Sequence, residues 1–476
     1  MRRVSLGHSR ALSGGLGGLG GLGLTSLLAF AACGGGASIH DPTGAGTAGA
    51  SGTAGDGNAD ASFAGGAGGA MDGGPAYDVG PVTYYHDVQP IIQEHCQMCH
   101  VTNGIAPFAL QSYDDAKQTA ALMAAATSQL VMPPWMPAQS CGDFRDERVL
   151  TPQEIATIGA WSQQGAPAGD PASAPVVTPN LGPDLGTPGA TLDPGADYHP
   201  NDALTDDYHC TLIDPALTTA QDLIGFDVHP GSTATVHHVL LFAVTSDKLA
   251  AVQAKDAAEA GPGWTCFGGT GVDATPVVGG WVPGSGATAF PAPTGIHLDA
   301  GTQIVMQIHY NLLTVKHVTD RTTADLFYAK TPILAQNRAA ITPVANTTFV
   351  IPANTIKTVG ADLPITGSLS FDLWGVVPHM HLHGTEIKVQ VEHADGSATC
   401  AVDIPKWNFH WQQFYYYEQP MKVVPGDKVH VDCTFDNLAA DEPIINGAQM
   451  TSAPLRWGEK TTDEMCLNYL YVTLAL

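Results

Sequence analysis

The spacing of apolar side chains predicts helices between residues 82 and 170. Three short helices are expected, at residues 87–95, 113–123 and 155–163. In the last of these, Ile155, Ile158 and Trp161 recur at helical spacing. A threonine, a proline and a glutamate precede it at positions 151, 152 and 154, in the order that begins many helices. We therefore predict a small all-α domain over residues 82–170.

A different pattern follows residues 171–191, a linker rich in Pro, Gly and Thr. Short apolar runs separated by Gly and Pro turns are typical of antiparallel strands in sandwiches. The runs occupy residues 222–228, 239–244, 302–309, 386–392 and 428–435. About 285 residues are too many for one sandwich of roughly 100 residues. We therefore predict two antiparallel β-sandwich domains, at residues 192–330 and 331–476, divided where a Lys-Thr-Pro sequence interrupts the pattern.

The beginning of the chain has the pattern of an exported protein. Residues 1–33 combine two early arginines with a short apolar run, and they end on small residues before Cys33. This resembles a bacterial lipoprotein signal peptide with Cys33 as the lipid-bearing residue, and the alternative is an ordinary cleaved signal. Residues 34–81 have almost no large apolar side chain and are expected to form a disordered linker. The expected location is the bacterial cell envelope, in the periplasm or at the cell surface, with the lipid as membrane anchor.

Charge and composition narrow the classes of partner. The 476 residues include 19 Lys and Arg against 45 Asp and Glu, which makes the formal net charge −26. That excess repels phosphate backbones, so nucleic acid is excluded as a partner. Charged residues make up only 13% of the chain, whereas 54 Gly and 34 Pro are present. This composition favours a turn-rich, exported β protein over a helical cytoplasmic one.

One motif in the predicted helical domain suits a covalently bound haem. Cys96, Cys99 and His100 have the C-x-x-C-H spacing, in which two thiols form thioethers to haem and the histidine binds iron. A disulfide or half of a zinc site is the alternative. The other axial ligand is expected from a proline-rich stretch downstream, with Met132 preferred and Met136 in reserve. We therefore expect a cytochrome c-like domain that carries haem c, a one-electron carrier.

Five histidines of the predicted β region are candidate metal ligands: His237, His238, His309, His379 and His381. The adjacent pair points to opposite faces of a regular strand, so both reach one metal only if the backbone twists or bulges. His309 lies in an apolar strand, where a lone histidine is usually a satisfied core residue. The last two have strand spacing on one face, which His383 shares, and this suits a metal site. Imidazole and thioether ligands suit copper.

Taken together, the motifs of residues 195–476 resemble those of the copper type II, ascorbate-dependent monooxygenases. The matching segments are residues 207–210, 235–242, 307–310, 379–381 and 463–469. The resemblance implies two antiparallel, jelly-roll-like sandwiches with one copper on each and an open cleft between them. It implies His237, His238 and His309 as ligands of the first copper, and His379, His381 and Met465 as ligands of the second. Tyr469 matches a tyrosine on the substrate side of the relatives.

The chain departs from the peptide-amidating members of that family. Val377 stands where those enzymes have an arginine that grips a substrate carboxylate, and Leu467 replaces an asparagine. A peptide with a free carboxylate is therefore not the expected substrate. Seven aromatic residues cluster at Trp407, Phe409, Trp411, Phe414, Tyr415, Tyr416 and Tyr417. They line an apolar pocket or, as the preferred alternative, belong to a sandwich core.

The nine cysteines fit an oxidising compartment. The resemblance implies the disulfides Cys210–Cys266 and Cys433–Cys466, the second next to Met465. Cys141 and Cys400 remain, either paired with each other across domains or free.

The expected function is a copper-dependent monooxygenase that hydroxylates a C–H bond of a small organic substrate with O2. Two copper ions and haem c are the expected cofactors, and the haem is expected to relay electrons to the first copper. The electrons would come from an ascorbate-like reductant or a periplasmic redox protein. The alternative is a non-catalytic haem and copper electron-transfer or copper-binding surface lipoprotein.

Overall fold

The computed structural model describes residues 79–475, apart from residues 103, 105, 283, 284, 314, 410 and 446. The signal peptide expected at residues 1–33, the lipid site at Cys33 and nearly all of the linker expected at residues 34–81 lie outside the described residues. Within those described ranges, no helix has both the length and the apolar character that crossing a bilayer requires.

Short helices form the first described region, as the apolar spacing predicts. They are η1 (Tyr84–Val88), α1 (Gln89–His95), α2 (Tyr113–Gln118), α3 (Ala120–Ser128) and α4 (Pro152–Gln163). The start of α4 is a capping box, in which Thr151 and Glu154 each satisfy a backbone amide of the other. Val88, Ile92, Ile158 and Trp161 are buried at the centre of the helices. That this region is a cytochrome c-like domain remains a prediction.

The single helix predicted over residues 113–123 is wrong in one respect, because it is broken at Thr119. The Thr119 hydroxyl donates to the carbonyl oxygens of Asp115 and Ala116, at 3.0 and 3.3 Å. Such bonds from a threonine side chain compete with the helix's own hydrogen bonds. Thr119 leaves the helical region of backbone conformation, with φ −107° and ψ 7°, and α3 starts afresh after it.

The next region consists of two antiparallel sheets. One sheet has the order β1 (Ala190–Leu192), β10 (Thr323–Tyr328), β3 (Gln221–His229) and β7 (Thr288–Ala289), with β8 (Ile296–Leu298) also paired to β3. The other has the order β5 (Trp264–Thr265), β2 (Asp206–Ile213), β9 (Gln303–Asn311), β4 (Val236–Val244) and β6 (Val277–Trp281). A helix that the sequence pattern did not predict, α5 (Ser246–Asp256), follows β4.

The last region also consists of two antiparallel four-stranded sheets. The first has the order β11 (Ala339–Asn346), β22 (Cys466–Ala475), β14 (Ser370–His379) and β17 (Tyr415–Val423). The second has the order β13 (Ile356–Pro364), β18 (Lys428–Asp436), β15 (Gly384–Glu392) and β16 (Ala398–Ile404). Two small ribbons pair β12 (Val350–Ile351) with β21 (Leu455–Arg456), and β19 (Ile444–Ile445) with β20 (Ala448–Gln449). Each four- or five-stranded sheet takes its strands from one side of the predicted boundary near residue 330.

The two β regions pack directly on each other through strand β4. All nine residues of β4 are buried. Val239 and Leu241 pack into the core of their own sandwich, whereas Leu240 and Phe242 pack against Tyr469 and Leu467 of β22. Since β4 is covered on both faces, its sequence is a continuous apolar run rather than an alternation.

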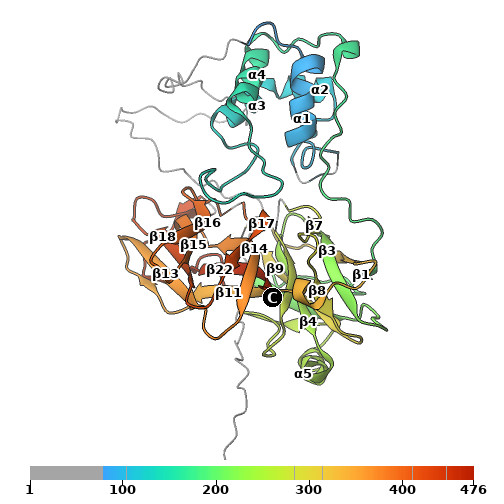
Figure 1. Cartoon of the computed structure of the whole chain (residues 1–476), viewed down its shortest axis with the longest axis vertical. Coiled ribbons are helices and arrows are strands. Elements are labelled where there is room, and N and C mark those ends of the chain that lie inside the picture. The colour runs from blue at the N-terminus through green and yellow to red at the C-terminus, as the bar shows by residue number, and fades with distance from the viewer. Residues whose placement is uncertain are drawn as a thin grey trace, which may run out of the picture.

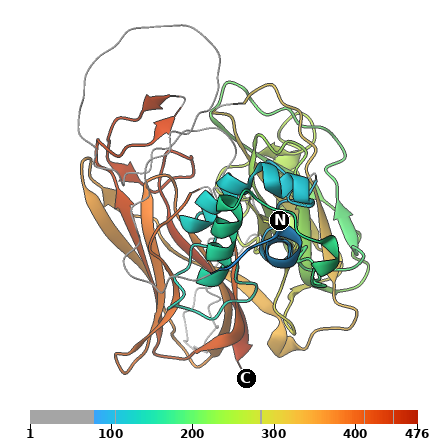
Figure 2. The same cartoon turned by 90° about the horizontal axis from the view of Figure 1, so that it is seen from above.

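The helices lie over one end of the two β regions, above their junction, as Figures 1 and 2 show from two directions. The segment between α3 and α4 descends onto the second β region. There Cys141 forms a disulfide with Cys400, the first of the two alternatives left open by the sequence. The backbone amide of Ala138 donates to the carbonyl of Asp403 at 2.7 Å. The chain itself leads from the helical region into the first sandwich, and this disulfide attaches the helical region covalently to the second.

Candidate metal centre

Three buried histidines converge in the first β region. The Nδ1 atom of His309 lies 2.9 Å from Nδ1 of His237 and 3.3 Å from Nδ1 of His238. All three residues are fully buried, and their nearest ring nitrogens lie within 4.8 Å of one another. Nitrogens bound about 2.0–2.1 Å from one tetrahedral ion are about 3.3 Å apart. The spacing of the three nitrogens therefore fits a shared metal ion.

A β-bulge brings the adjacent histidines to one side. Along the pairing of β4 with β9, Val236 lies opposite Tyr310 and His238 lies opposite His309, which leaves His237 as an extra residue. An extra residue in one strand re-aims its side chain. This is the departure from a regular strand that the adjacent pair required.

Asp206 and Tyr208 of β2 hold the ring of His309. Nε2 of His309 lies 3.0 Å from the Asp206 carboxylate, and the Tyr208 ring stacks on it with centroids 4.1 Å apart. If Nε2–H donates to Asp206, Nδ1 carries the lone pair that a metal needs. Burial is the largest effect on His309 and lowers its pKa, so the ring is neutral at pH 7. Burial and the neighbouring His309 likewise hold the pKa of both His237 and His238 well below the usual range.

His379 and His381 form a second cluster at the end of β14. Their ring centroids lie 5.1 Å apart. Nδ1 of His379 lies 2.6 Å from the side-chain oxygen of Gln412, and Nδ1 of His381 lies 2.9 Å from the carbonyl oxygen of Asp463. Since an oxygen acceptor requires N–H at Nδ1, each ring keeps its lone pair at Nε2. Nε2 of His381 is buried and has no hydrogen-bond partner among the described residues, as expected for an atom reserved for a metal.

The strand pairing predicts that Met465 lies on the same side as these histidines. His379 lies directly opposite Leu467 in the pairing of β14 with β22. Directly opposed residues share a face, as do residues two apart along a strand. His381, two residues after His379, and Met465, two residues before Leu467, are therefore expected on that face. Met465 is fully buried.

Glu464 links the backbones of His381 and Met465 by hydrogen bonds. It was not among the site residues predicted from the sequence. One carboxylate oxygen accepts from the backbone amides of His381 and Met465 at 3.0 and 3.3 Å. The other accepts from the backbone amide of His383 at 2.6 Å. The ring of His383 does not join the metal cluster but lies between Glu464 and Glu442, with ring nitrogens 3.3 and 3.1 Å from their oxygens. Burial opposes protonation of this ring, yet the two carboxylates outweigh it and raise the His383 pKa.

The two clusters are connected across the junction of the sandwiches. The ring of Phe409 lies 5.6 Å from that of His237 and 6.2 Å from that of His381, between centroids. The Thr461 hydroxyl donates to Asp206 at 2.8 Å. The hydroxyl of Tyr208 donates to the carbonyl of Glu459 at 2.6 Å. The loop that leads to Met465 thus contacts both residues that hold His309.

Two disulfides brace these clusters. Cys210–Cys266 joins β2 to the segment after β5, and Cys433–Cys466 joins β18 to the first residue of β22. Both are the pairs that the resemblance implied. The second immediately follows Met465 in the chain, so it restrains the start of the strand that carries the methionine.

The C-x-x-C-H motif forms a turn at the end of α1. Cys96 and Cys99 have no disulfide partner within the described part of the chain. Burial raises the pKa of Cys96 to about 12, so this thiol is protonated at neutral pH. Nδ1 of His100 lies 3.0 Å from the carbonyl of Phe108, which leaves Nε2 as the nitrogen suited to bind iron.

The two methionines considered as the other haem ligand have different surroundings. Met132 is 42% exposed, just after α3. The sulfur of Met136 instead accepts a hydrogen bond from the backbone amide of Asn408 at 3.2 Å, on the second sandwich. The reserve candidate is therefore engaged elsewhere, and Met132 stays the predicted ligand.

Tyr469 lies in β22 and is fully buried where the sandwiches meet, opposite Val377 of β14. It packs with Met465, Leu467 and Tyr208. Burial holds its pKa well above the usual range, so the hydroxyl is neutral. Its role on the substrate side remains a prediction.

The aromatic residues between positions 407 and 417 pack in different places. Tyr415 and Tyr417 belong to the core of the second sandwich, as the preferred alternative had it. Phe414 and Tyr416 pack against the core of the first. Phe409 neighbours both histidine clusters.

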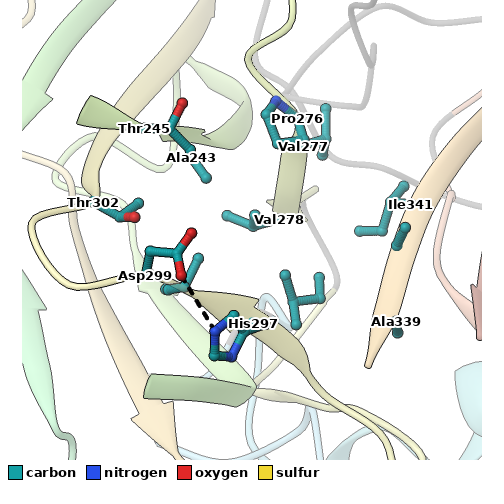
Figure 3. Close-up of a pocket in the computed structure, with 13 residues that line it drawn as sticks. Ala243, Thr245, Pro276, Val277, Val278, His297, Asp299, Thr302, Ala339 and Ile341 are labelled. Carbon is teal, nitrogen blue, oxygen red and sulfur yellow. Dashed lines mark ion pairs between the residues drawn. The ribbon is translucent and has the colours of Figure 1, made fainter. Parts of the chain in front are cut away.

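A pocket of about 190 Å³ lies elsewhere in the junction (Figure 3). It is lined by residues at the far end of β4, such as Ala243, together with β6, β8 and the start of β11. Within it His297 pairs with Asp299 at 3.4 Å. Ala243 is six residues from His237 along a strand, about 20 Å away, so this pocket is separate from the histidine clusters.

Comparisons with known proteins agree with the motifs of the β regions. Residues 331–473 match the family described as copper type II ascorbate-dependent monooxygenase, C-terminal domain. A DBH-like monooxygenase protein 1 of Gallus gallus is 22% identical over 286 residues, which cover 55% of this chain and 41% of that protein. A tyramine beta-hydroxylase of Caenorhabditis briggsae is 22% identical over 286 residues, 57% of this chain and 43% of that protein. The chain thus spans about two fifths of these relatives. The matches show that the β regions are similar to copper type II ascorbate-dependent monooxygenases.

The solved structures compared are too distant to bear on the fold. The structure of an infectious bursal disease virus VP2 subviral particle is 9% identical to this chain, with a TM-score of 0.16. The aligned region covers 60% of this chain and 71% of the VP2 chain. An allantoicase structure is 15% identical to this chain, with a TM-score of 0.15. The aligned region covers 57% of this chain and 90% of the allantoicase chain.

Proposed function

We propose that this protein is a copper-dependent monooxygenase that hydroxylates a C–H bond of a small organic substrate. The proposal rests on one observation: each sandwich carries a histidine cluster, and the two clusters lie at the junction of the sandwiches. His237, His238 and His309 would hold the first copper, and His379, His381 and Met465 the second. When bound, the two coppers would supply one-electron redox chemistry and activation of O2. The reaction consumes one O2, two electrons and two protons, and yields the hydroxylated product and water.

The donor chemistry of the two clusters fits copper and distinguishes their roles. Neutral imidazoles in the first cluster suit both Cu(II) and Cu(I), as electron storage requires. A thioether in the second cluster favours Cu(I), the form that must react with O2. Asp206 lies against Nε2 of His309, and Gln412 and the backbone carbonyl of Asp463 accept from Nδ1 of His379 and His381. In these three rings the other nitrogen is left for a metal.

The helical region is proposed to carry haem c on Cys96, Cys99 and His100, with Met132 as the other axial ligand. The contact between Nδ1 of His100 and the carbonyl of Phe108 leaves Nε2 as the nitrogen that would bind the iron. Docking of this region on the second sandwich supports a role in electron delivery, from an ascorbate-like reductant or a periplasmic redox protein. Three disulfides support an exported protein, and we propose a lipid anchor at Cys33 in the cell envelope.

One observation favours a second candidate, a non-catalytic electron-transfer or copper-binding lipoprotein. The ligand residues of both clusters are fully buried, and the ring of Phe409 neighbours both. Such packing protects a redox carrier from O2. An oxygenase must instead admit its substrate to the metal.

The test is oxygen incorporation by the copper-loaded protein. With ascorbate and ¹⁸O2, a panel of small aromatic and aliphatic substrates is screened for a product heavier by one ¹⁸O atom. The expected result is labelled product in an amount equal to the O2 consumed, lost in the His379→Ala variant. Two bound coppers that are reduced and reoxidised with no labelled product from any substrate would favour the electron carrier.

A further inference from the structure

The helical region holds a turn of the second sandwich that contacts both histidine clusters. This turn, of which the structure describes residues 408, 409 and 411–413, lies in the connection between β16 and β17. Its Gln412 side chain is buried and accepts from Nδ1 of His379 at 2.6 Å. The amide nitrogen of Gln412 donates to the carbonyl of Phe409 at 3.1 Å, which fixes the orientation of the side chain. Whatever holds this turn therefore also sets the ring of His379 and the place of Phe409.

The segment between α3 and α4 contacts the turn at both ends. At its start, the backbone amide of Asn408 donates to the sulfur of Met136 at 3.2 Å. At its end, the guanidinium of Arg148 lies over the ring of Trp411, 5.4 Å from its centroid, and donates to the side-chain oxygen of Gln413. A planar guanidinium makes both contacts at once, by stacking with its face and donating from its edge. Gln413 is buried, so its hydrogen bond is shielded from water.

Other contacts keep this segment in place independently of Arg148. The Cys141–Cys400 disulfide joins it to β16. Arg145 and Tyr416, and Glu418 and Asp143, are paired by backbone hydrogen bonds of 2.8 and 2.9 Å. Loss of the Arg148 side chain therefore leaves the helical region docked and removes only the contacts with Trp411 and Gln413.

We propose that Arg148 is a positioning residue for the second metal site. Its stacking on Trp411 and its hydrogen bond to Gln413 hold the turn so that Gln412 orients His379. The helical region is then a structural part of the metal centre, besides any role in carrying electrons. This inference rests on the proposed function, because it assigns His379 to a copper site.

The experiment compares Cu(II) binding by the full chain and by single and double variants. Partners behind a metal ligand typically contribute 10–100-fold to metal affinity, and Arg148 acts through Gln412, so Arg148→Ala should weaken the second site about tenfold. The first site should keep its affinity. Arg148→Lys keeps the charge but not the planar contacts, and should recover only part of the loss. The control is Arg321→Ala, which removes an exposed arginine paired with Asp193.

Electron paramagnetic resonance of each variant loaded with Cu(II) separates the two sites. The signal of the second site should change in Arg148→Ala and in Gln412→Ala. Because both changes act on one ring, the double variant should lose less affinity than the two single losses combined. Amide hydrogen exchange over residues 405–415 should speed up in Arg148→Ala, with or without copper. Gln413→Ala, which removes the acceptor alone, should speed it up as well.

The outcomes are distinct. Unchanged second-site affinity together with unchanged exchange in Arg148→Ala overturns the positioning role, whatever the activity of the protein. An additive double variant also overturns it. Conversely, a wild-type protein that binds two coppers but forms no hydroxylated product refutes the proposed function, while a selective loss at the second site still supports the role of Arg148.

Discussion

Glu464 accepts a hydrogen bond from the backbone amide of His381 at 3.0 Å. His381 lies just after strand β14, and Glu464 lies just before strand β22. The same carboxylate also accepts from the backbone amide of Met465. One buried side chain thus links the backbones of two candidate ligands of the second site that lie 84 residues apart in the sequence.

Replacement of this carboxylate should damage the second site and the fold together. Glu464→Gln places an amide NH2 group against backbone donors, and it leaves the ring of His383 with one charged partner instead of two. Breaking a buried network of this kind costs about 3 kcal/mol, and copper affinity at the second site should fall 10–100-fold. Urea unfolding and copper titration measure both effects. Glu386→Gln, on the exposed side of β15, is the control. Wild-type second-site affinity in Glu464→Gln would contradict this role.

Met465→Leu should abolish turnover while the first site still binds copper. The two side chains have similar volume, so the buried position tolerates the change at a cost below about 1.5 kcal/mol. Only the sulfur is lost. Metal analysis should give close to one copper per chain, measured beside product formation. Met306→Leu replaces another fully buried methionine, in the core of the first sandwich, and should keep both coppers. Normal turnover in Met465→Leu would remove this residue from the second site.

Asp206→Asn should weaken the first site and spare the second. The carboxylate lies against Nε2 of His309 and accepts from Thr461. Burial acts to raise the Asp206 pKa, but these hydrogen bonds outweigh it and hold the pKa well below its usual range. Loss of the charge should lower first-site copper affinity 10–100-fold, seen by competition with a chelator. Asp325→Asn, at a more exposed carboxylate beside His229, is the matched control. Equal weakening at both sites would argue against separate clusters.

Glu459 should make stability depend on pH. Burial, with a smaller contribution from Asp463, raises its pKa from 4.5 to about 7. The folded state therefore holds this proton more tightly than the unfolded state, so the stabilisation is full below pH 4.5 and is lost as pH rises through 7. The loss corresponds to about 3 kcal/mol.

Glu459→Gln should remove that dependence. Its melting temperature should exceed the wild-type value at pH 8.5 and nearly equal it at pH 4, where the wild-type carboxyl is mostly neutral in the folded and unfolded states alike. Thermal unfolding followed by circular dichroism at both pH values measures the difference. Glu418→Gln, at an exposed position, should leave the pH profile of the wild type. A constant gap between Glu459→Gln and wild type at the two pH values would show that burial does not raise this pKa.

Removal of the Cys141–Cys400 disulfide should loosen the helical region from the second sandwich. The bond spans 259 residues, and closing so long a loop contributes several kcal/mol, about 5 in the chain-entropy estimate. The Cys141→Ser, Cys400→Ser double variant should show faster amide exchange over residues 134–148 at an unchanged exchange rate in β4. Unchanged exchange of that segment would show that its hydrogen bonds suffice for docking.

Local patterns in the sequence determined the elements and their chemical residue types. The helix starting after Thr151 is specified by residues within one turn of each other. Strands such as β15 and β18 follow from alternation of apolar and polar residues, because neighbouring side chains on a strand face opposite sides. The spacing of His379 and His381 suggested a metal site, but the complete ligand set, Met465 included, came only from the family resemblance of several separate segments.

Tertiary structure decided how those residues meet. The bulge at His237 depends on the pairing of β4 with β9, which is not encoded by the adjacent histidines themselves. Gln412 reaches His379 from a separate segment, and nothing in its immediate sequence sets it apart. Glu464 neighbours Met465 in the chain, but its bonds to the amides of His381 and His383 depend on the fold. The pairing of Cys141 with Cys400 required the helical region to dock on β16. Such contacts join residues far apart in the chain, so they depend on the packing of whole elements rather than on any local preference.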